Sequence, residues 1–175
     1  MMYHNRRYRG TMYILRGLPG TGKSGIAWNL WQEEGGEIVS FFDYYRIYHN
    51  SQMNTAYFGR AHKWARKTAK DALERGVDPV IINNCNMPRW HMYPYVLMAF
   101  TRDYWIEFIE TEDTWNVPLE ELERRCDDIP LSVLDRMKES YEPARNPYDV
   151  LLDEYAESRW ISSREMAQYN WSNIQ

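Results

Sequence analysis

Apolar residues gather in four short runs along the chain, and longer amphipathic segments separate them. The runs are rich in aromatic and β-branched residues, and most are flanked by glycine or proline, which is typical of buried strands. They cover residues 11–16, 37–41, 79–83 and 104–109. Because strands that alternate with helices form parallel sheets covered on both faces, the pattern predicts an α/β fold with a mainly parallel sheet of about four strands.

The segments between and after these runs have the periodicity of helices. In the longest, residues 55–75, alanine, leucine and tryptophan recur on one face, whereas lysine and arginine dominate the rest. Further helices are expected at residues 26–31, 90–100, 119–125, 131–141, 149–160 and 162–169. We find no repeat, linker or low-complexity segment, so residues 1–175 are expected to form a single domain. Its motif-bearing core covers about residues 12–142, and a helical tail covers residues 143–175.

Composition narrows the class of protein. The chain is 44% hydrophobic and 15% aromatic, which excludes global disorder. Its 175 residues suit one domain with a sizeable core. Two cysteines are too few for a disulfide framework or a metal knuckle. The net charge of −4 is mild, so it neither indicates nucleic-acid binding nor excludes a local basic groove.

The sequence contains no recognisable signal for membrane insertion or secretion. The first ten residues are basic and polar, without the apolar segment of a secretory signal. No apolar run approaches the roughly 20 residues that span a bilayer. We therefore expect an intracellular protein, cytoplasmic or nuclear, that is not secreted and binds no membrane.

A P-loop pattern, GxxxxGK[ST], lies between the first predicted strand and the first predicted helix. Its residues are Gly17, Leu18, Pro19, Gly20, Thr21, Gly22, Lys23 and Ser24. In a strand–loop–helix unit, successive backbone N–H groups turn toward one point and the helix N-terminus adds partial positive charge. Lys23 can then reach the β- and γ-phosphates of ATP, and the Ser24 hydroxyl can bind Mg²⁺. The pattern therefore predicts a binding site for ATP and Mg²⁺.

Polar side chains follow the second and third predicted strands. Because ligands of a parallel α/β sheet lie beyond the carboxyl ends of the strands, Asp43 and Arg46 are expected near the γ-phosphate end of the P-loop. A carboxylate there can accept the proton of an attacking hydroxyl, and a guanidinium can neutralise charge on the transferring phosphoryl group. The amides of Asn84 and Asn86 can bond a substrate, a metal-bound water or each other. By themselves they are also typical turn residues.

The long predicted helix supplies candidate contacts to nucleic acid. Arginine, lysine and histidine recur between residues 60 and 70, and the aromatic rings of Tyr57 and Trp64 are interleaved with them. Basic residues can neutralise backbone phosphates, and aromatic rings can stack on bases. A solvated basic helix face explains the same pattern equally well.

Several segments resemble one known family, in the same order along the chain. Besides the P-loop with the preceding Arg16, and Asp43 after the second strand, they are AHKW at residues 61–64, PVIINNCN at 79–86, WHMYPYV at 90–96 and LEELERR at 119–125. Over residues 12–142 the chain resembles the P-loop kinase domain of the Nedd-four-binding-protein-two type. That domain is related to bacteriophage polynucleotide 5′-hydroxyl kinase and to the kinase-like half of cyclic-nucleotide phosphodiesterase.

The resemblance implies both a fold and an activity. The fold is a three-layer α/β/α P-loop kinase domain with a helical lid. The activity is Mg²⁺-dependent transfer of the ATP γ-phosphate to a 5′-hydroxyl of DNA or RNA. The residues that match the family's functional positions are Lys23 and Ser24 for phosphate and Mg²⁺, Asp43 for the catalytic base, Arg46 for the arginine three residues beyond it, and Arg124 and Arg125 for the lid arginines.

The chain departs from the family pattern after the third predicted strand. The family usually has an aspartate where this chain has Asn84, whereas Asn86 matches the pattern. An amide can neither balance the charge of Mg²⁺ nor accept a proton. Two other functions therefore stay open: a catalytically weak ATP-binding module that acts as a switch or scaffold, and a kinase for a small metabolite.

Overall fold

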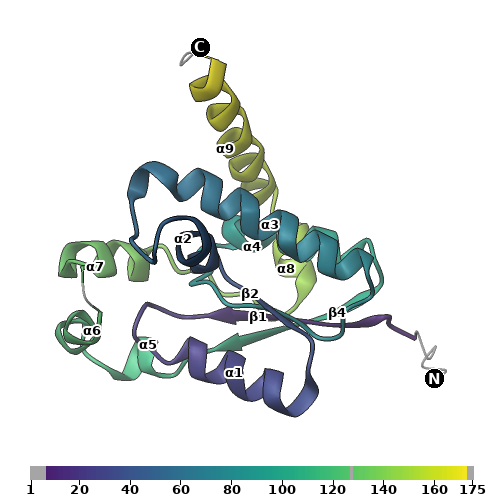
Figure 1. Ribbon diagram of the computed structural model, residues 1–175, viewed down its shortest axis with the longest axis horizontal. Helices are drawn as coiled ribbons and strands as arrows, with labels where there is room; N and C mark the ends of the chain where they lie inside the picture. Colours follow the sequence, from purple (N-terminus) through teal and green to yellow (C-terminus); the bar gives the residue numbers. More distant parts are fainter. Residues whose placement is uncertain (1–6, 127, 173–175) are drawn as a thin grey trace.

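The four predicted strands form one parallel sheet in the order β2–β3–β1–β4 (Figure 1). This computed structural model describes residues 7–126 and 128–172, with side chains described as far as Ser163. The strands are β1 (Gly10–Arg16), β2 (Glu37–Val39), β3 (Val80–Ile82) and β4 (Tyr104–Glu110). β2 is shorter than predicted because the backbone of Phe41 is already helical and begins the next element.

The two faces of the sheet are covered by different helices. On one face the strands pack against α3 (Phe58–Glu74) and α4 (Arg89–Phe100), and on the other against α1 (Lys23–Glu34). Successive strand residues point to opposite faces, so neighbours in β1 and β3 belong to different cores. Met12, Ile14, Val80 and Ile82 lie in the first core, and Leu15 and Ile81 lie in the second. The predicted three-layer α/β/α fold is confirmed.

The carboxyl ends of the strands meet at one edge of the sheet, on the left of Figure 1. There β2 leads into α2 (Phe42–Tyr48), and the short helix η1 (Thr55–Tyr57) continues the chain into α3. After β4 the chain forms α5 (Asp113–Asn116), α6 (Leu119–Arg125) and α7 (Leu131–Glu139). Leu18 of the P-loop is fully buried with Leu122 of α6 and Leu134 of α7. Helices α6 and α7 therefore stand where the lid was expected.

The C-terminal helices are divided differently from the prediction. The chain forms α8 (Pro147–Leu151) and α9 (Glu154–Ser172), rather than helices at residues 149–160 and 162–169. The side chain of Asn146 caps α8, and Asp153 Oδ1 accepts a hydrogen bond from the Ala156 N–H at the start of α9. These capping side chains set the helix boundaries. Residues 173–175 of the predicted tail lie outside the described residues.

Helix α9 packs against α4 at its beginning and then projects from the body of the molecule (Figure 1). Its length of 19 residues is close to that of a membrane span. Charged and polar residues recur along it, however. Within the part of the chain that the structure describes, we find no helix both long enough and apolar enough to cross a bilayer.

Candidate nucleotide-binding and phosphotransfer site

The P-loop joins the end of β1 to the beginning of α1. Gly20 and Gly22 have φ angles of 80° and 90°, which side chains other than glycine rarely adopt. The ammonium group of Lys23 donates hydrogen bonds to the carbonyl oxygens of Gly17, at 2.8 Å, and Leu18, at 2.9 Å. Since an ammonium group carries three hydrogens, one more is left to reach a phosphate. The lysine is therefore held across the loop by the backbone that it helps to shape.

The side of the loop that would receive phosphate is open. No side chain caps the N-terminus of α1 within the described residues, so the backbone N–H groups of its first turn can bind an anion. A Cβ atom added at Gly22 would meet no atom within 4 Å. By contrast, a Cβ atom at Gly17 would lie 2.0 Å from the hydroxyl oxygen of Thr111. The loop is thus packed on one side and accessible on the other, as a phosphate cradle requires.

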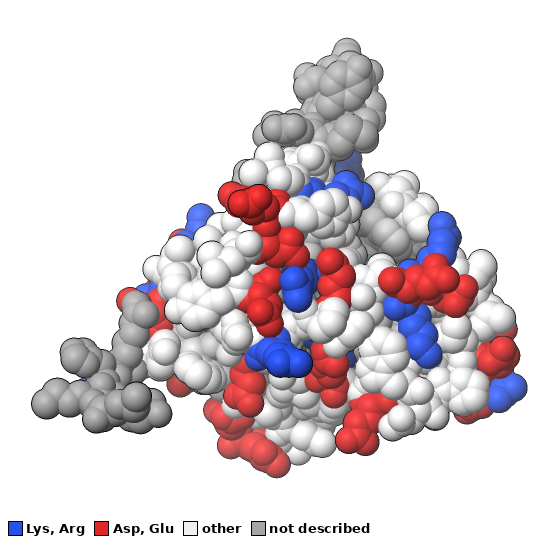
Figure 2. Space-filling view, turned by 180° about the vertical axis from the view of Figure 1, so that it is seen from behind, with Lys and Arg blue, Asp and Glu red and all other residues white. Residues whose placement is uncertain are grey.

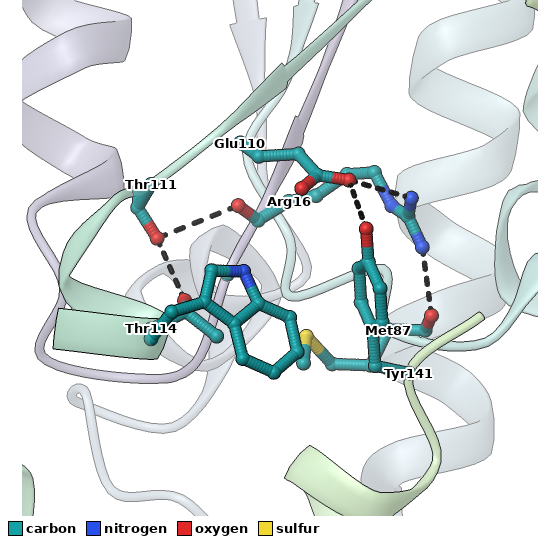
Figure 3. A pocket seen from close by; sticks show the side chains of 8 residues that line it. Arg16, Met87, Glu110, Thr111, Thr114 and Tyr141 are labelled. Atoms are coloured by element: carbon teal, nitrogen blue, oxygen red, sulfur yellow. Dashed lines mark hydrogen bonds and ion pairs between the residues drawn. The ribbon is translucent and has the colours of Figure 1, made fainter. Parts of the chain in front are cut away.

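Three threonine hydroxyls support the packed side of the P-loop, and Figure 3 shows those of Thr111 and Thr114. Thr111 Oγ1 donates to Thr21 Oγ1 at 2.7 Å, and it lies 2.9 Å from Thr114 Oγ1. Thr21 in turn donates to the Leu18 carbonyl, and Thr114 accepts from the Leu18 N–H. The parallel pairing of Arg16 with Glu110 brings Thr111 beside Gly17. The role of Thr111 and Thr114 at the P-loop was not predicted, because local sequence patterns do not reveal which strands are neighbours.

Arg16, the last residue of β1, is 1% exposed and ties three segments together (Figure 3). Its guanidinium donates to the carbonyl oxygens of Asn86 and Met87 at 2.9 and 2.8 Å, and to Glu110 Oε1 at 2.9 Å. The Tyr141 hydroxyl donates to the same Glu110 oxygen at 2.6 Å, and its ring lies 4.7 Å from the guanidinium. Burial lowers the pKa of Arg16, and the carboxylate of Glu110 opposes that shift. This network fixes the strand end from which the P-loop begins.

Asp43 lies at the same sheet edge as the P-loop serine. Asn83, directly after β3, donates from Nδ2 to Ser24 Oγ at 3.3 Å. The next residue, Asn84, accepts a hydrogen bond from the Phe41 N–H at 3.1 Å. These contacts join the start of α1, the end of β3 and the turn into α2, and the first turn of α2 carries Asp43. Asp43 therefore follows the carboxyl end of β2, and its position near the γ-phosphate end of the P-loop stays a prediction.

Asp43 and Arg46 lie one turn apart on α2 and touch each other. Arg46 Nη2 is 3.3 Å from Asp43 Oδ1, and the two side chains are 67% and 29% exposed. Both residues were expected after a strand, but no helix was predicted in the segment that forms α2. The helix forms because Tyr45 buries its ring beside Phe41 and Phe58, which outweighs the weak helix propensity of aromatic residues. The catalytic roles of Asp43 and Arg46 stay predictions.

The two lid arginines differ in their position relative to the P-loop. Arg125 Nη1 donates to the Gly20 carbonyl at 3.1 Å and to Asp113 Oδ2 at 2.9 Å. The hydrogen bond with Asp113 is the main reason that the pKa of Arg125 is raised. Arg124 instead pairs with Glu121 on its own helix and is 70% exposed. The structure therefore brings Arg125 into contact with the P-loop, and both arginines lie beside Glu121.

The predicted substrate amides are buried. Asn84 and Asn86 are 6% and 3% exposed. Besides accepting from Phe41, Asn84 donates to the Tyr95 hydroxyl at 3.5 Å. Asn86 donates to the carbonyl oxygens of Leu15, at 2.8 Å, and Asn84, at 3.3 Å. These contacts hold the loop after β3, and substrate binding by either amide stays a prediction.

Residues 12–144 match the protein family described as AAA domain. NEDD4-binding protein 2 from Homo sapiens is 37% identical over 133 residues, which are 75% of this chain but only 8% of that protein. The Pnkp1/Rnl/Hen1 RNA repair complex has a chain with TM-score 0.63 and 23% identity, covering 80% of this chain and 46% of that one. A gluconokinase from Sinorhizobium meliloti 1021 has TM-score 0.50 and 13% identity, covering 94% and 98%. With its P-loop on a parallel sheet, the chain thus belongs to the AAA domain family and has a P-loop kinase-like fold.

Proposed function

We propose that this chain is a kinase that uses ATP and Mg²⁺ to phosphorylate the 5′-hydroxyl of a nucleic acid. The observation that carries the proposal is the path of hydrogen bonds from Ser24 through Asn83 and Asn84 to the turn before Asp43. That path links the P-loop serine to the turn before Asp43, which supports a role for the Asp43 carboxylate opposite the γ-phosphate. The fold shared with a chain of the Pnkp1/Rnl/Hen1 RNA repair complex supports nucleic acid as the acceptor.

The residues present suit a nucleoside triphosphate. The first-turn amides of α1 and the ammonium group of Lys23 would bind the β- and γ-phosphates, and the Ser24 hydroxyl would ligate Mg²⁺. When bound, Mg²⁺ neutralises negative charge on the phosphate oxygens. Arg125 already contacts the P-loop backbone, so its guanidinium is placed to approach the same phosphates.

The transfer itself is an in-line displacement. The acceptor 5′-oxygen forms a bond to the γ-phosphorus, and the bond from that phosphorus to the β,γ-bridging oxygen breaks. The proton of the acceptor hydroxyl moves to the Asp43 carboxylate, and the negative charge leaves on ADP. Lys23 and Arg46 offset charge on the transferring group. A positioned base of this kind contributes roughly 10²–10⁴ in rate.

A catalytically weak ATP-binding module is the second candidate. Asn84 supplies a neutral amide where the family pattern has an acid, and its side chain is already bonded to Phe41 and Tyr95. Asp43 is paired with Arg46 as well.

A kinase for a small metabolite is a further candidate. The fold shared with a gluconokinase over 94% of this chain supports keeping a small metabolite among the acceptors to be tested.

A label-transfer assay separates these functions. The protein is incubated with Mg²⁺, γ-labelled ATP and one of four acceptors: single-stranded DNA or RNA with a 5′-hydroxyl, the same DNA with a 5′-phosphate, or gluconate. We expect label on the two 5′-hydroxyl oligonucleotides and none with Lys23→Met. Label on gluconate alone would identify a small-metabolite kinase. ATP binding without any transfer would identify the module.

A further inference from the structure

A hollow of about 450 Å³ opens between the end of α2 and the start of η1. One wall is a pair of rings, because His49 and Tyr57 stack with centroids 4.4 Å apart and planes inclined by 20°. Both rings stay partly exposed. The hollow is lined by His49, Gln52, Met53, Asn54, Thr55 and Tyr57. Polar groups around a flat aromatic wall are suited to a planar, polar ligand.

The loop that forms the hollow is held in place by its own hydrogen bonds. The hydroxyl of Tyr45, which is 1% exposed, donates to the Asn54 carbonyl at 2.8 Å. The Ser51 N–H donates to the Tyr45 carbonyl at 3.0 Å, and the Asn54 side chain accepts from the Ala56 N–H at 2.9 Å. A ligand entering the hollow therefore finds its walls already formed, which lowers the ordering cost of binding.

Aromatic rings connect the hollow to Asp43. Tyr44, the neighbour of Asp43, lies 5.4 Å from His49 between ring centroids, and His49 stacks on Tyr57. Asp43 lies in the first turn of α2 and His49 directly follows its end, six positions later, which corresponds to a rise of about 9 Å along the helix axis. Stacked nucleotides advance about 3.4 Å each along a strand. A strand whose 5′-hydroxyl meets Asp43 would thus carry its second to fourth base near the hollow.

Basic side chains continue from the hollow along α3. The Arg60 guanidinium lies 5.6 Å from the centre of the Tyr57 ring. Lys63 and Lys67 follow at helical spacing and are exposed, so the three cations share one face of the helix. On the back of the molecule, by contrast, Figure 2 shows acidic and basic side chains interspersed. The α3 face is therefore complementary to the phosphates of a strand that leaves the hollow.

We propose that the hollow is a nucleobase subsite for a single-stranded acceptor. An unpaired base near the 5′ end stacks on the His49–Tyr57 pair, and the phosphates that follow lie against Arg60, Lys63 and Lys67. The acceptor end is single-stranded because a duplex hides the faces of its bases. This inference rests on the proposed function for the direction of the strand, but base binding at the hollow does not require phosphate transfer.

The first test measures binding of a 5′-hydroxyl DNA 12-mer with a 3′ fluorophore by anisotropy, without ATP. Stacking on an aromatic ring contributes about 1–3 kcal/mol per base, so Tyr57→Ala should weaken binding about tenfold. Tyr57→Phe should bind like the wild type. Tyr155→Ala, which removes a tyrosine 65% exposed on α9, is the matched control and should change nothing. Wild-type affinity in Tyr57→Ala would overturn the subsite.

The second test varies the DNA and compares the wild type with Tyr57→Ala. An abasic site placed in turn at each of the first four nucleotides should weaken wild-type binding about tenfold at one position and should not weaken Tyr57→Ala further. Equal binding of all four abasic strands would overturn the proposal. Binding of a blunt duplex with the affinity of the single strand would also overturn it. Tyr57-dependent binding without label transfer would keep the subsite and remove the kinase. Label transfer by Tyr57→Ala with an unchanged KM for the oligonucleotide would keep the kinase and remove the subsite.

Discussion

Arg16 organises the P-loop side of this site from a position that solvent does not reach. Four groups surround its guanidinium: the carbonyl oxygens of Asn86, Met87 and Glu142, and the carboxylate of Glu110. A guanidinium can serve them all because it presents five hydrogens in a planar fork, whereas an ammonium group offers three from a single point. The cost of burying the charge is visible in the lowered pKa of Arg16.

Replacing Arg16 by lysine should therefore destabilise the protein although the charge is kept. We expect the free energy of unfolding to fall by about 2–4 kcal/mol, because buried carbonyls and Glu110 lose partners. The matched control is Arg75→Lys, whose surface pair with Glu37 is 2.8 Å long and should contribute less than about 1 kcal/mol. Urea denaturation measures both variants. Equal losses in the two would show that burial of Arg16 carries no special energy.

Part of the site could be predicted residue by residue, and part could not. The P-loop residues are recognisable because their chemistry depends on a contiguous stretch of backbone. Thr111, Thr114 and Glu110 meet the P-loop only because β4 pairs with β1, and no local pattern states that pairing. Arg16 precedes the P-loop in the sequence, but its burial depends on segments that lie 70 or more residues away.

Helix α6 carries both lid arginines, and helical geometry separates them. Consecutive residues on an α-helix point about 100° apart, so Arg124 and Arg125 leave α6 in different directions, although both reach Glu121. Arg125 touches the carbonyl of Gly20, whereas Arg124 pairs along its own helix with Glu121. The order LEELERR predicted two candidates, and the packing of Leu122 against Leu18 selects one of them.

Of the two lid arginines, only Arg125 should affect the affinity for ATP. Arg125→Gln should raise the Kd for ATP about tenfold, since a hydrogen bond between charged groups contributes about 1.5–3 kcal/mol. Arg124→Gln removes the same charge one position earlier and should change the Kd less than twofold. Titration of each variant with a fluorescent ATP analogue gives both values. Similar effects of the two substitutions would mean that net charge, and not contact with the P-loop, governs binding.

Elements with a strong periodic pattern were predicted well, and elements defined by capping or tertiary contact were not. The four strands and α3 follow from apolar runs and an apolar stripe. Helix α2 depends on burial of Tyr45 between Phe41 and Phe58, which no short window reveals. The start of α8 depends on Asn146 as a cap and the start of α9 on Asp153, signals that the sequence does contain.

Across the whole molecule, strand order determines what meets at the carboxyl edge. The P-loop strand β1 lies between β3 and β4, so its loop is flanked by Asn83 on one side and Thr111 on the other. β2 lies beyond β3, which explains why the contact between Asn84 and Phe41 connects the turn before Asp43 to the rest of the site. The His62 ring of α3, which is partly buried, also packs at this place and stacks on Phe41 with ring centroids 4.7 Å apart.

The stability of this arrangement should depend on pH through His62. Burial, with a smaller effect of Arg66, lowers the pKa of His62 to about 4. As pH falls from about 6.5 to 4, the unfolded chain binds a proton at this residue that the folded chain does not, so stability falls. Above pH 6.5 the contribution is fully present. His62→Phe keeps a ring against Phe41 and removes the titration.

Urea denaturation at pH 7, 6 and 5 tests this prediction. The wild type should lose stability relative to His62→Phe as pH falls, by on the order of 1–2 kcal/mol at pH 5. A difference between wild type and His62→Phe that stays constant from pH 7 to 5 would contradict the assignment.

One paired measurement tests directly whether Asp43 acts as the base opposite the P-loop. For Asp43→Asn, the Kd for ATP and the rate of label transfer to a 5′-hydroxyl oligonucleotide are measured on the same preparation. Asp71→Asn, which changes an exposed aspartate of α3 in the same way, is the control. For Asp43→Asn we expect a Kd for ATP within about twofold of the wild type and a transfer rate at least about 10²-fold lower. For Asp71→Asn we expect both values to be unchanged. Wild-type transfer by Asp43→Asn would contradict this role of Asp43.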